Sequence, residues 1–359
     1  MLPPRDPDEI LKARGADTRP ANRFDRLATE RAHDGWDIPE DAALLRTEVT
    51  NETPRSIITR NRSPDVPFDR SINPYRGCEH GCIYCFARPS HAYWGLSPGL
   101  DFETKLTAKP EAARLLAEEI AKPSYRVAPI AFGTNTDPYQ PVESKLRIMP
   151  GLWQVLLDWN HPASLVTRGQ TVLRDLPLLA EMAARQLVHV GVSITTLDAG
   201  LARAMEPRAP APATRLRMIR DLADAGIQVR VMVAPVIPVL TEPEIERILS
   251  AAREAGATHA SMIPLRLPLE VAPLFRDWLA RHRPDAATHV MNRVRAMRGG
   301  RDNDPRFGAR MRGEGIEAEL MLSRFRLALK RLNYARTIPP LDCTRFGPPP
   351  RAGDQLSLF

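Results

Sequence analysis

The sequence has few cysteines, little lysine and no long hydrophobic run. Its 359 residues include only four cysteines, too few for a disulfide framework in a chain of this length. No run of about 18 apolar residues occurs, so no membrane-spanning helix is expected. The amino-terminal residues MLPPRDPDEILKARG lack the apolar stretch of a secretory signal. These absences predict a cytoplasmic protein with no membrane partner.

Charge is unevenly distributed along the chain. The formal net charge is +7, yet residues 281–351 alone carry 16 Lys or Arg against 7 Asp or Glu. Such an excess near the carboxyl end favours a polyanionic partner, usually nucleic acid. A solvated, arginine-rich surface is the alternative, since only six residues of the whole chain are lysine.

Strand-like and helix-like segments alternate from about residue 68. Hydrophobic patterning predicts six strands, at 71–75, 127–132, 164–167, 187–194, 227–236 and 257–264. Helices are predicted between them at 108–121, 152–159, 174–185 and 214–225, and a last one ends at 255. Thr241 and Glu244 are spaced as a capping box for that last helix. Such alternation predicts an α/β fold with parallel strands, in an open partial barrel or a doubly wound sheet. In both folds the site lies at the carboxyl ends of the strands.

Four regions follow from this pattern. Residues 1–66 are predicted to be an N-terminal arm, with one β-favouring stretch at 57–59, and residues 67–270 the α/β core. Residues 271–337 form a basic helical extension, with helices expected at 273–282, 286–297 and 316–334. Residues 338–359 are predicted to be a flexible, proline-rich tail.

Three cysteines follow the first predicted strand directly. They occur in Cys78-Glu-His-Gly-Cys82-Ile-Tyr-Cys85, and Gly77 and Gly81 give this loop the freedom to wrap a metal group. Three thiolates can hold three irons of a four-iron cluster and leave the fourth iron open to a small chelating molecule. The alternative is structural zinc, with His80 or His91 as the fourth ligand, although no second Cys or His pair accompanies the loop.

The spacing Cys-x3-Cys-x2-Cys, with Tyr84 before the last cysteine, resembles the radical S-adenosylmethionine (SAM) superfamily. The resemblance runs from about residue 71 to 264. It implies a partial (β/α)6 TIM-type barrel in which Cys78, Cys82 and Cys85 hold a [4Fe–4S] cluster whose bare iron binds SAM. An electron from a reductant such as flavodoxin or ferredoxin would cleave SAM to methionine and a 5′-deoxyadenosyl radical, which abstracts hydrogen from the substrate.

The resemblance also assigns roles to residues at the ends of the predicted strands. The turn after the second strand would receive the methionine amino group, although the family's usual Gly-Gly-Glu is replaced here by Gly133, Thr134, Asn135, Thr136 and Asp137. Thr167 and Arg168 end the third strand, where relatives place a basic residue on the SAM carboxylate.

Further strand-end residues complete the implied cofactor site. Ser193 stands where relatives contact ribose or carboxylate, and Arg208 is a second carboxylate candidate. Tyr84, Val233 and Pro235 match positions near the adenine. Each has an ordinary alternative: Thr167 and Ser193 as strand-end caps, or Glu206 and Arg208 as a surface ion pair.

Two stretches resemble one branch of this superfamily. Residues 71–78 (SINPYRGC) and 133–143 (GTNTDPYQPVE) are similar to spore photoproduct lyase and its "DNA repair photolyase" relatives, which implies a nucleic-acid lesion as substrate. Those lyases use a further cysteine to return a hydrogen atom, and this chain has none between Phe86 and Asp342. Cys343 could serve only by folding over the barrel mouth, and Tyr139 or Tyr93 could relay a radical. A related radical reaction is therefore expected rather than the lyase reaction itself.

The last five residues carry a second motif. Gln355, Leu356, Leu358 and Phe359 lie in QLSLF after a proline-rich segment. The pattern resembles the peptide by which bacterial polymerases and repair proteins dock on the β sliding clamp of DNA polymerase. The alternative is that these apolar side chains dock on the protein's own surface.

The leading hypothesis is a radical SAM enzyme that acts on DNA or a nucleotide. A second is radical SAM modification of tRNA or of a protein. A third is a non-catalytic, clamp-associated DNA-binding protein with a structural metal loop.

Overall fold

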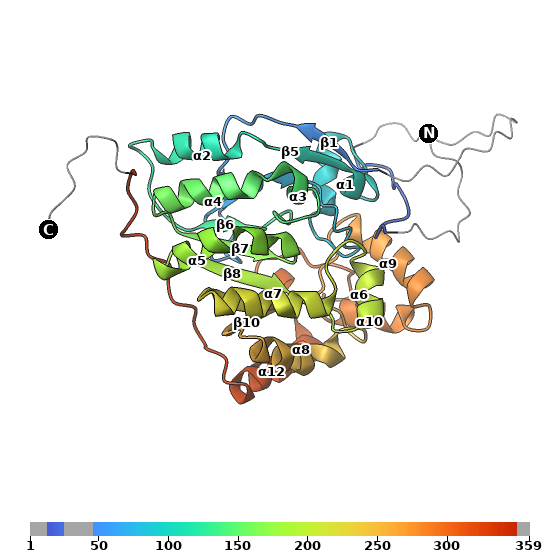
Figure 1. The fold of residues 1–359 in the computed structure, drawn as a ribbon. Coiled ribbons are helices and arrows are strands. Elements are labelled where there is room, and N and C mark those ends of the chain that lie inside the picture. Colours follow the sequence, from blue (N-terminus) through green and yellow to red (C-terminus); the bar gives the residue numbers. More distant parts are fainter. Residues whose placement is uncertain (1–12, 25–45, 350–359) are drawn as a thin grey trace, which may run out of the picture.

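The protein is built around a seven-stranded sheet (Figure 1). The computed structural model describes residues 13–24 and 46–349. The sheet order is β10-β9-β8-β7-β6-β3-β2. Its strands are β2 (Thr59–Arg60), β3 (Arg70–Ile72), β6 (Ile130–Phe132), β7 (Ala163–Thr167), β8 (Val188–Ser193), β9 (Gln228–Val236) and β10 (His259–Pro264).

Six of these strands are parallel and follow one another in chain order from β3 to β10. A doubly wound sheet reverses its strand order at a switch point, whereas a barrel is wound in one direction. The uninterrupted order therefore confirms the partial (β/α)6 TIM-type barrel. The short β2 pairs antiparallel with β3 and adds the seventh strand.

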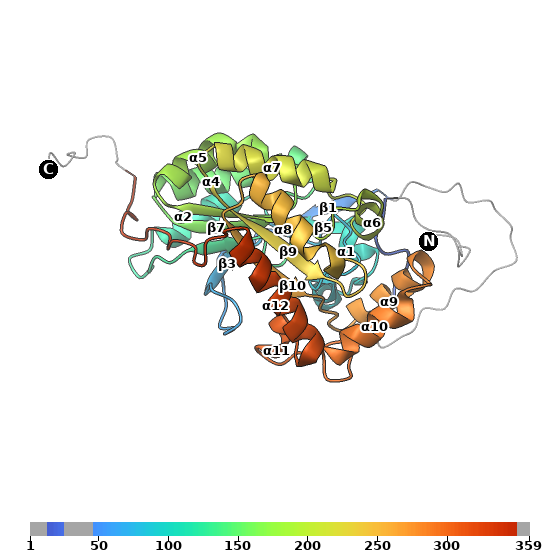
Figure 2. The same cartoon turned by 90° about the horizontal axis from the view of Figure 1, so that it is seen from below.

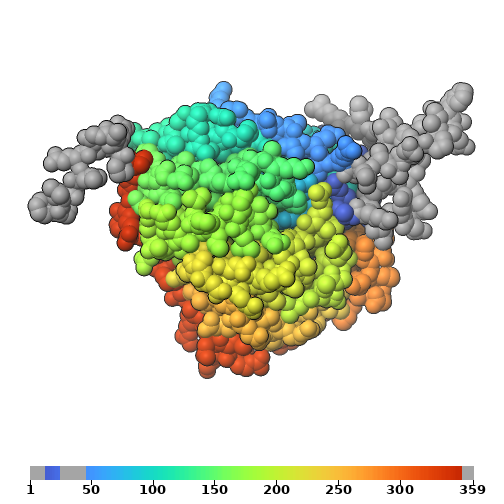
Figure 3. Space-filling view, viewed as in Figure 1, coloured from blue at the N-terminus to red at the C-terminus, as the bar shows by residue number. Residues whose placement is uncertain are grey.

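A layer of helices covers the outer face of the sheet (Figure 1), and the segments that contain them form much of the surface seen in Figure 3. Their inward faces supply the core, in which Trp153 is fully buried with its ring centroid 5.0 Å from that of Phe132. The layer consists of α2 (Ala112–Ile120), α4 (Ile148–Asp158), α5 (Leu176–Ala184), α7 (Pro212–Asp224) and α8 (Ile245–Glu254). Apart from the first strand, the strands and helices predicted for the core from hydrophobic periodicity are thus confirmed, with shifted ends.

The predicted capping box of the helix before residue 255 is wrong. Thr241 makes no capping hydrogen bond from its side chain, and its hydroxyl instead accepts from the amide of Ile237. Glu244 turns to the preceding crossover, where its carboxylate accepts from the Thr196 hydroxyl and the Leu197 amide. The carboxylate secures a neighbouring loop, and a short helix, η3 (Glu242–Glu244), precedes α8.

A second, three-stranded sheet lies beside the barrel, with the order β1-β5-β4. It contains β1 (Glu48–Asn51), β4 (Tyr75–Arg76) and β5 (Lys105–Ala108). The predicted strand at 71–75 is therefore split, because β3 joins the barrel while β4 pairs antiparallel with β5. The remaining short elements around the barrel are η1 (Arg88–Trp94), α1 (Asp101–Thr104), α3 (Glu143–Leu146), η2 (Gln170–Asp175) and α6 (Ala199–Met205).

The basic extension forms α9 (Val271–His282), α10 (Ala287–Ala296), α11 (Ala309–Arg312) and α12 (Gly315–Arg331) (Figure 2). Several of its arginines pair with carboxylates of the rest of the chain. Arg293 reaches Glu242 at 2.6 Å, and Arg324 reaches Glu246 at 2.8 Å. The ion pairs therefore neutralise part of the predicted basic surface within the protein itself.

The segment after α12 runs across the amino ends of the barrel strands. The amide of Asp342 donates to the carbonyl of Gln186 just before β8, and that of Gly347 donates to Trp159 before β7. Phe346 stacks on Trp159 with a centroid distance of 5.8 Å. This course places Cys343 at the end of the barrel opposite the cysteine loop. None of the helices in the described segments is long and apolar enough to cross a membrane.

Candidate functional site

The cysteine loop leaves β4 and turns at the carboxyl ends of the barrel strands. Gly77 and Gly81 both adopt positive φ, of 74° and 68°, which a side chain would strain. A Cβ at Gly77 would also lie 2.8 Å from the Phe102 carbonyl oxygen. The predicted glycine requirement of the loop therefore has a conformational and a packing cause.

The three thiols are largely enclosed by protein. Cys78 and Cys82 are buried and Cys85 is half-buried, and none forms a disulfide. Burial raises the pKa of each thiol, that of Cys82 to about 12. Among the described residues, no three Cys, His, Asp or Glu side chains converge as ligands of one ion would. A cluster takes its thiolates on separate irons, so it does not need such convergence.

A buried ion pair anchors the loop from behind. Arg88 donates to the carbonyl of Cys82 at 2.9 Å and to Glu103 at 2.5 Å, and both charged side chains are fully buried. The Glu103 carboxylate also accepts from the amides of Gly15 and Ala16, at 3.0 and 2.9 Å. One carboxylate thus ties the N-terminal arm to the cysteine loop.

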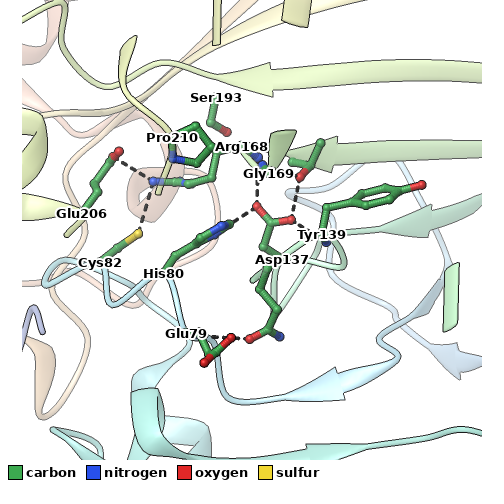
Figure 4. A network of polar contacts seen from close by, with 12 residues as sticks. Glu79, His80, Cys82, Asp137, Tyr139, Arg168, Gly169, Ser193, Glu206 and Pro210 are labelled. Atoms are coloured by element: carbon green, nitrogen blue, oxygen red, sulfur yellow. Dashed lines mark hydrogen bonds and ion pairs between the residues drawn. The ribbon is translucent and has the colours of Figure 1, made fainter. Parts of the chain in front are cut away.

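Arg168 reaches the cysteine loop from the end of β7 (Figure 4). Its Nη1 lies 3.3 Å from Cys82 Sγ, 2.7 Å from the Tyr84 hydroxyl and 2.8 Å from Glu206 Oε1. Glu206 also pairs with Arg215 and accepts from Thr195 at 2.7 Å. Burial alone would raise the pKa of the Glu206 carboxyl, but Arg215 and Arg168 outweigh it and lower that pKa. Arg168 therefore keeps a cation beside a cysteine thiol.

Asp137 joins three strand-end segments. One carboxylate oxygen accepts from the Thr167 hydroxyl at 2.6 Å, and the other from the Arg168 amide at 2.9 Å. His80 Nδ1 lies 3.4 Å from Asp137 without a hydrogen bond. Burial lowers the pKa of His80 to about 4 despite that carboxylate, so the ring is neutral. Asp137 thus positions Arg168 through its backbone and faces the cysteine loop (Figure 4).

The turn after β6 wraps the side chain of Asn73. Asn73 Oδ1 accepts from the amide of Asn135 at 3.1 Å, and its Nδ2 lies 3.3 Å from the Thr134 hydroxyl. Thr136 is buried and donates to the Tyr75 carbonyl at 3.1 Å. Gly133 adopts a φ of 78°, and a Cβ there would lie 1.9 Å from the Val166 carbonyl oxygen. The turn expected to meet the methionine amino group is therefore tightly built.

The other predicted cofactor residues are placed differently. Ser193 ends β8 as predicted and is buried beside Arg168 (Figure 4). Val233 directs its side chain into the core, and the bond between Ala234 and Pro235 is cis. Arg208 pairs with the buried Glu79 of the cysteine loop at 3.1 Å and forms no ion pair with Glu206 among the described contacts. The surface pair considered for Glu206 and Arg208 is therefore wrong, because Glu206 is buried and paired with other arginines.

The side chains considered for zinc binding or radical relay have separate environments. His91 is buried, and its Nε2 lies 3.0 Å from the Lys105 carbonyl oxygen. Tyr139 is a core residue whose hydroxyl donates to Asp175 at 2.8 Å and accepts from Trp153 at 2.6 Å. Tyr93 is 73% exposed on η1.

Sequence analysis missed Asn73, Arg88, Glu103, Thr195 and Arg215. Each is a polar residue near a segment that carries a recognised motif. Asn73 and Glu103 have partners more than 60 residues away, in the turn after β6 and in the N-terminal arm. Thr195 and Arg215 lie in the same crossover as their partner Glu206. A buried charge needs a counter-charge, so a buried Glu206 could have suggested its arginine partners, and Arg88 could have suggested Glu103. The bonds of Glu103 to the backbone amides of the arm carry no sequence signal.

These residues fit an iron–sulfur cluster with SAM. Three thiols share one glycine-containing loop, and Arg168 and Arg88 place cations near thiolates that burial alone would keep protonated. Metal binding deprotonates cysteine, which removes the penalty that burial imposes on the free thiolate. The polar strand ends beside the loop offer the backbone and side-chain donors that an amino acid carboxylate needs.

Known proteins share parts of this sequence. An uncharacterized protein of Mycobacterium tuberculosis is 41% identical over 222 residues, which cover 61% of this chain and 65% of that protein. An uncharacterized protein of Methanocaldococcus jannaschii is 25% identical over 178 residues, which cover 48% of this chain and 62% of the relative. The chain thus spans somewhat less than two thirds of the length of these relatives.

Solved structures share the fold. Spore photoproduct lyase complexed with dinucleoside spore photoproduct aligns with a TM-score of 0.58 at 13% identity, over 79% of both chains. A mutant of that lyase aligns with a TM-score of 0.55 at 15% identity, over the same shares.

The family assignment rests on the sequence match and on the site together. Residues 72–252, half of the chain, match the model of the Radical SAM superfamily, and this range includes all three loop cysteines, Arg168 and Glu206. Members of this superfamily use an iron–sulfur cluster and SAM. The chain belongs to the radical SAM superfamily.

Proposed function

We propose that the protein is a radical SAM enzyme in which Cys78, Cys82 and Cys85 bind a [4Fe–4S] cluster. The observation that carries this proposal is the enclosed three-cysteine loop at the carboxyl ends of the six parallel strands, with Arg168 3.3 Å from Cys82 Sγ. When bound, the cluster and SAM supply a one-electron cleavage that yields a hydrogen-abstracting 5′-deoxyadenosyl radical.

The chain's own residues would bind and orient the cofactor. The guanidinium of Arg168 would pair with the SAM carboxylate, and the carboxylate of Asp137 holds the Arg168 backbone in place. Gly133 and the turn as far as Asp137 would receive the amino group, while Ser193 and Arg208 offer further polar contacts. Tyr84 and the backbone edge from Val233 to Pro235 would border the adenine. The N-terminal arm and the Arg88–Glu103 pair exclude water from the rear of the loop.

We propose a nucleic acid or nucleotide as the substrate, in a reaction related to but distinct from that of the lyase. The shared fold and the 133–143 motif support this choice. The hydrogen-donor cysteine has no counterpart, because the fourth cysteine, Cys343, lies at the opposite end of the barrel. A different hydrogen donor, or consumption of SAM, is therefore part of the proposal.

An anaerobic turnover assay tests this function. The reconstituted protein, supplied with dithionite and SAM, should form 5′-deoxyadenosine, and a substrate should accelerate the reaction. Damaged DNA, undamaged DNA, tRNA and a nucleotide distinguish the substrate classes. A colourless protein that binds one zinc ion and forms no deoxyadenosine would support the non-catalytic alternative instead.

The carboxyl-terminal motif remains a separate proposal. Gln355, Leu356, Leu358 and Phe359 lie outside the described residues, and we propose that they dock on the β sliding clamp. Binding of the full chain to purified clamp, compared with a chain that ends at residue 354, tests it. Equal binding by the two chains would contradict clamp docking.

A further inference from the structure

A group of polar side chains shares the inner face of the barrel below the proposed cofactor site. In the parallel register His189 of β8 pairs with Gln228 of β9, and Gly191 pairs with Arg230. Arg230 also pairs with His259 of β10, and Met232 with Ser261. Paired residues in adjacent strands point to the same side of a sheet. The alternate residues of β9 are buried valines of the helix-covered core, so the polar set faces inward.

Arg230 lacks a counter-charge in the described part of the chain, where it forms no hydrogen bond and no ion pair. Its Nε is buried without a partner, as are Gln228 Oε1 and Ser261 Oγ. Burial lowers the pKa of Arg230, and no carboxylate opposes that effect. Burial, with Arg230 and His259 nearby, also lowers the pKa of His189 to about 4, so His189 adds no positive charge at neutral pH.

Three other arginines near the site have acceptors within the fold. Arg88 pairs with Glu103, and Arg215 pairs with Glu206. Arg298 donates through its two Nη groups to four backbone carbonyl groups, although its Nε, like that of Arg230, has no partner. Desolvating a cation without a partner is costly, and a fold normally avoids it. Arg230 differs from these arginines because no described carbonyl or carboxylate accepts from any of its donors.

The position of Arg230 relates it to the proposed cofactor site. Ser193, a predicted SAM contact, pairs with Met232, two residues beyond Arg230 on the same face of β9. Two residues along a strand correspond to about 7 Å. Arg230 thus lies one layer deeper in the barrel than Ser193, on the strand next to it.

We propose that Arg230, together with Ser261, binds an oxyanion of the substrate, either a phosphate or a carboxylate. A guanidinium presents paired donors that match such groups, and a hydroxyl adds a further donor. The assignment of this anion to the substrate rests on the proposed function, since the cofactor would occupy the layer above. The anion would fix one end of the substrate while its reactive carbon faces the strand ends.

Binding of simple anions tests this proposal on the full-length, cluster-reconstituted protein. Inorganic phosphate, thymidine monophosphate and acetate are titrated calorimetrically into the wild type, Arg230→Met and Arg220→Met. Arg220 is an exposed arginine on α7 and serves as the matched control. We expect a dissociation constant at least about tenfold higher in Arg230→Met and unchanged in Arg220→Met. The probe that binds more tightly distinguishes phosphate from carboxylate.

Thermal unfolding without added anion separates this role from a structural one. Removing this unpaired, half-buried cation should leave the melting temperature of Arg230→Met equal to or above that of the wild type. If Arg230→Met does not fold, Arg230→Gln carries the same comparison. Equal anion binding by the Arg230 variant and the control would overturn the proposal, as would failure of both Arg230 variants to fold.

The result of the anion-binding experiment does not depend on whether the protein cleaves SAM. Arg230-dependent anion binding in a protein that does not cleave SAM would refute the proposed function and leave the anion site standing. SAM cleavage without Arg230-dependent anion binding would support the proposed function and refute the anion site.

Discussion

Glu103 provides the sharpest test of how the cysteine loop is held. Its carboxylate accepts from Arg88, Gly15 and Ala16, and both Glu103 and Arg88 are fully buried. Glu103→Gln preserves the shape of the side chain but removes its charge. It also replaces one acceptor oxygen by an NH2 group that faces a donor. Arg88 then remains buried without a counter-charge.

The expected loss of stability follows from that burial. Breaking a buried ion pair by removing one partner costs about 3–5 kcal/mol in the free energy of unfolding. Urea denaturation of the full chain, followed by tryptophan fluorescence, measures the change. Because Arg88 also binds the carbonyls of Gly81 and Cys82, the same variant should retain less iron after reconstitution.

An exposed ion pair of similar length is the matched control. Arg114 lies 2.6 Å from Glu118, but both side chains are more than half exposed. Solvent screens such a pair, so Glu118→Gln should unfold like the wild type. If Glu103→Gln lost no more stability than Glu118→Gln, the carboxylate would not be the anchor of the loop.

Two further substitutions test separate parts of the structure. Gly133→Ala should destabilise the protein by at least ~2 kcal/mol, because its Cβ would meet the Val166 carbonyl. Gly226→Ala has the same φ of 78° and open space around it, so an equal loss in urea denaturation would contradict the packing argument. Burial lowers the pKa of His161 from 6.5 to about 4, so its contribution to stability is complete above pH 6.5 and declines as the pH falls to 4. The advantage of the wild type over His161→Gln in the free energy of unfolding should therefore shrink by up to ~3 kcal/mol between pH 7 and pH 4, whereas a constant difference would refute the assigned pKa.

Local patterns in the sequence were sufficient for the barrel and for the cysteine loop. Buried parallel strands such as β8 and β9 are continuous apolar or alternating runs, and the helices between them bury one face each. Their order in the sequence is their order in the sheet, so prediction of the elements nearly determined the topology. The cysteines could be placed because they directly follow the first strand.

Features that depend on distant partners were not predictable. The exposed β1 has no hydrophobic signal, and it pairs with β5 more than 50 residues away. A surface pair of Glu206 with the nearby Arg208 was the alternative considered, but the structure pairs Glu206 with Arg168, 38 residues away, and with Arg215. The charge excess of the extension also overstated the free positive surface, since Arg293 and Arg324 pair with acidic residues of the barrel. Charge counts along a chain do not show which charges meet after folding.

Iron and sulfide analysis of two cysteine variants tests the central claim most directly. After anaerobic reconstitution, the wild type and Cys343→Ser should each hold about four iron and four sulfide per chain, because Cys343 lies at the opposite end of the barrel. Cys82→Ser should lose the cluster together with its visible absorbance, and it should form no 5′-deoxyadenosine from SAM. Equal iron content in Cys82→Ser and Cys343→Ser would contradict a cluster on this loop.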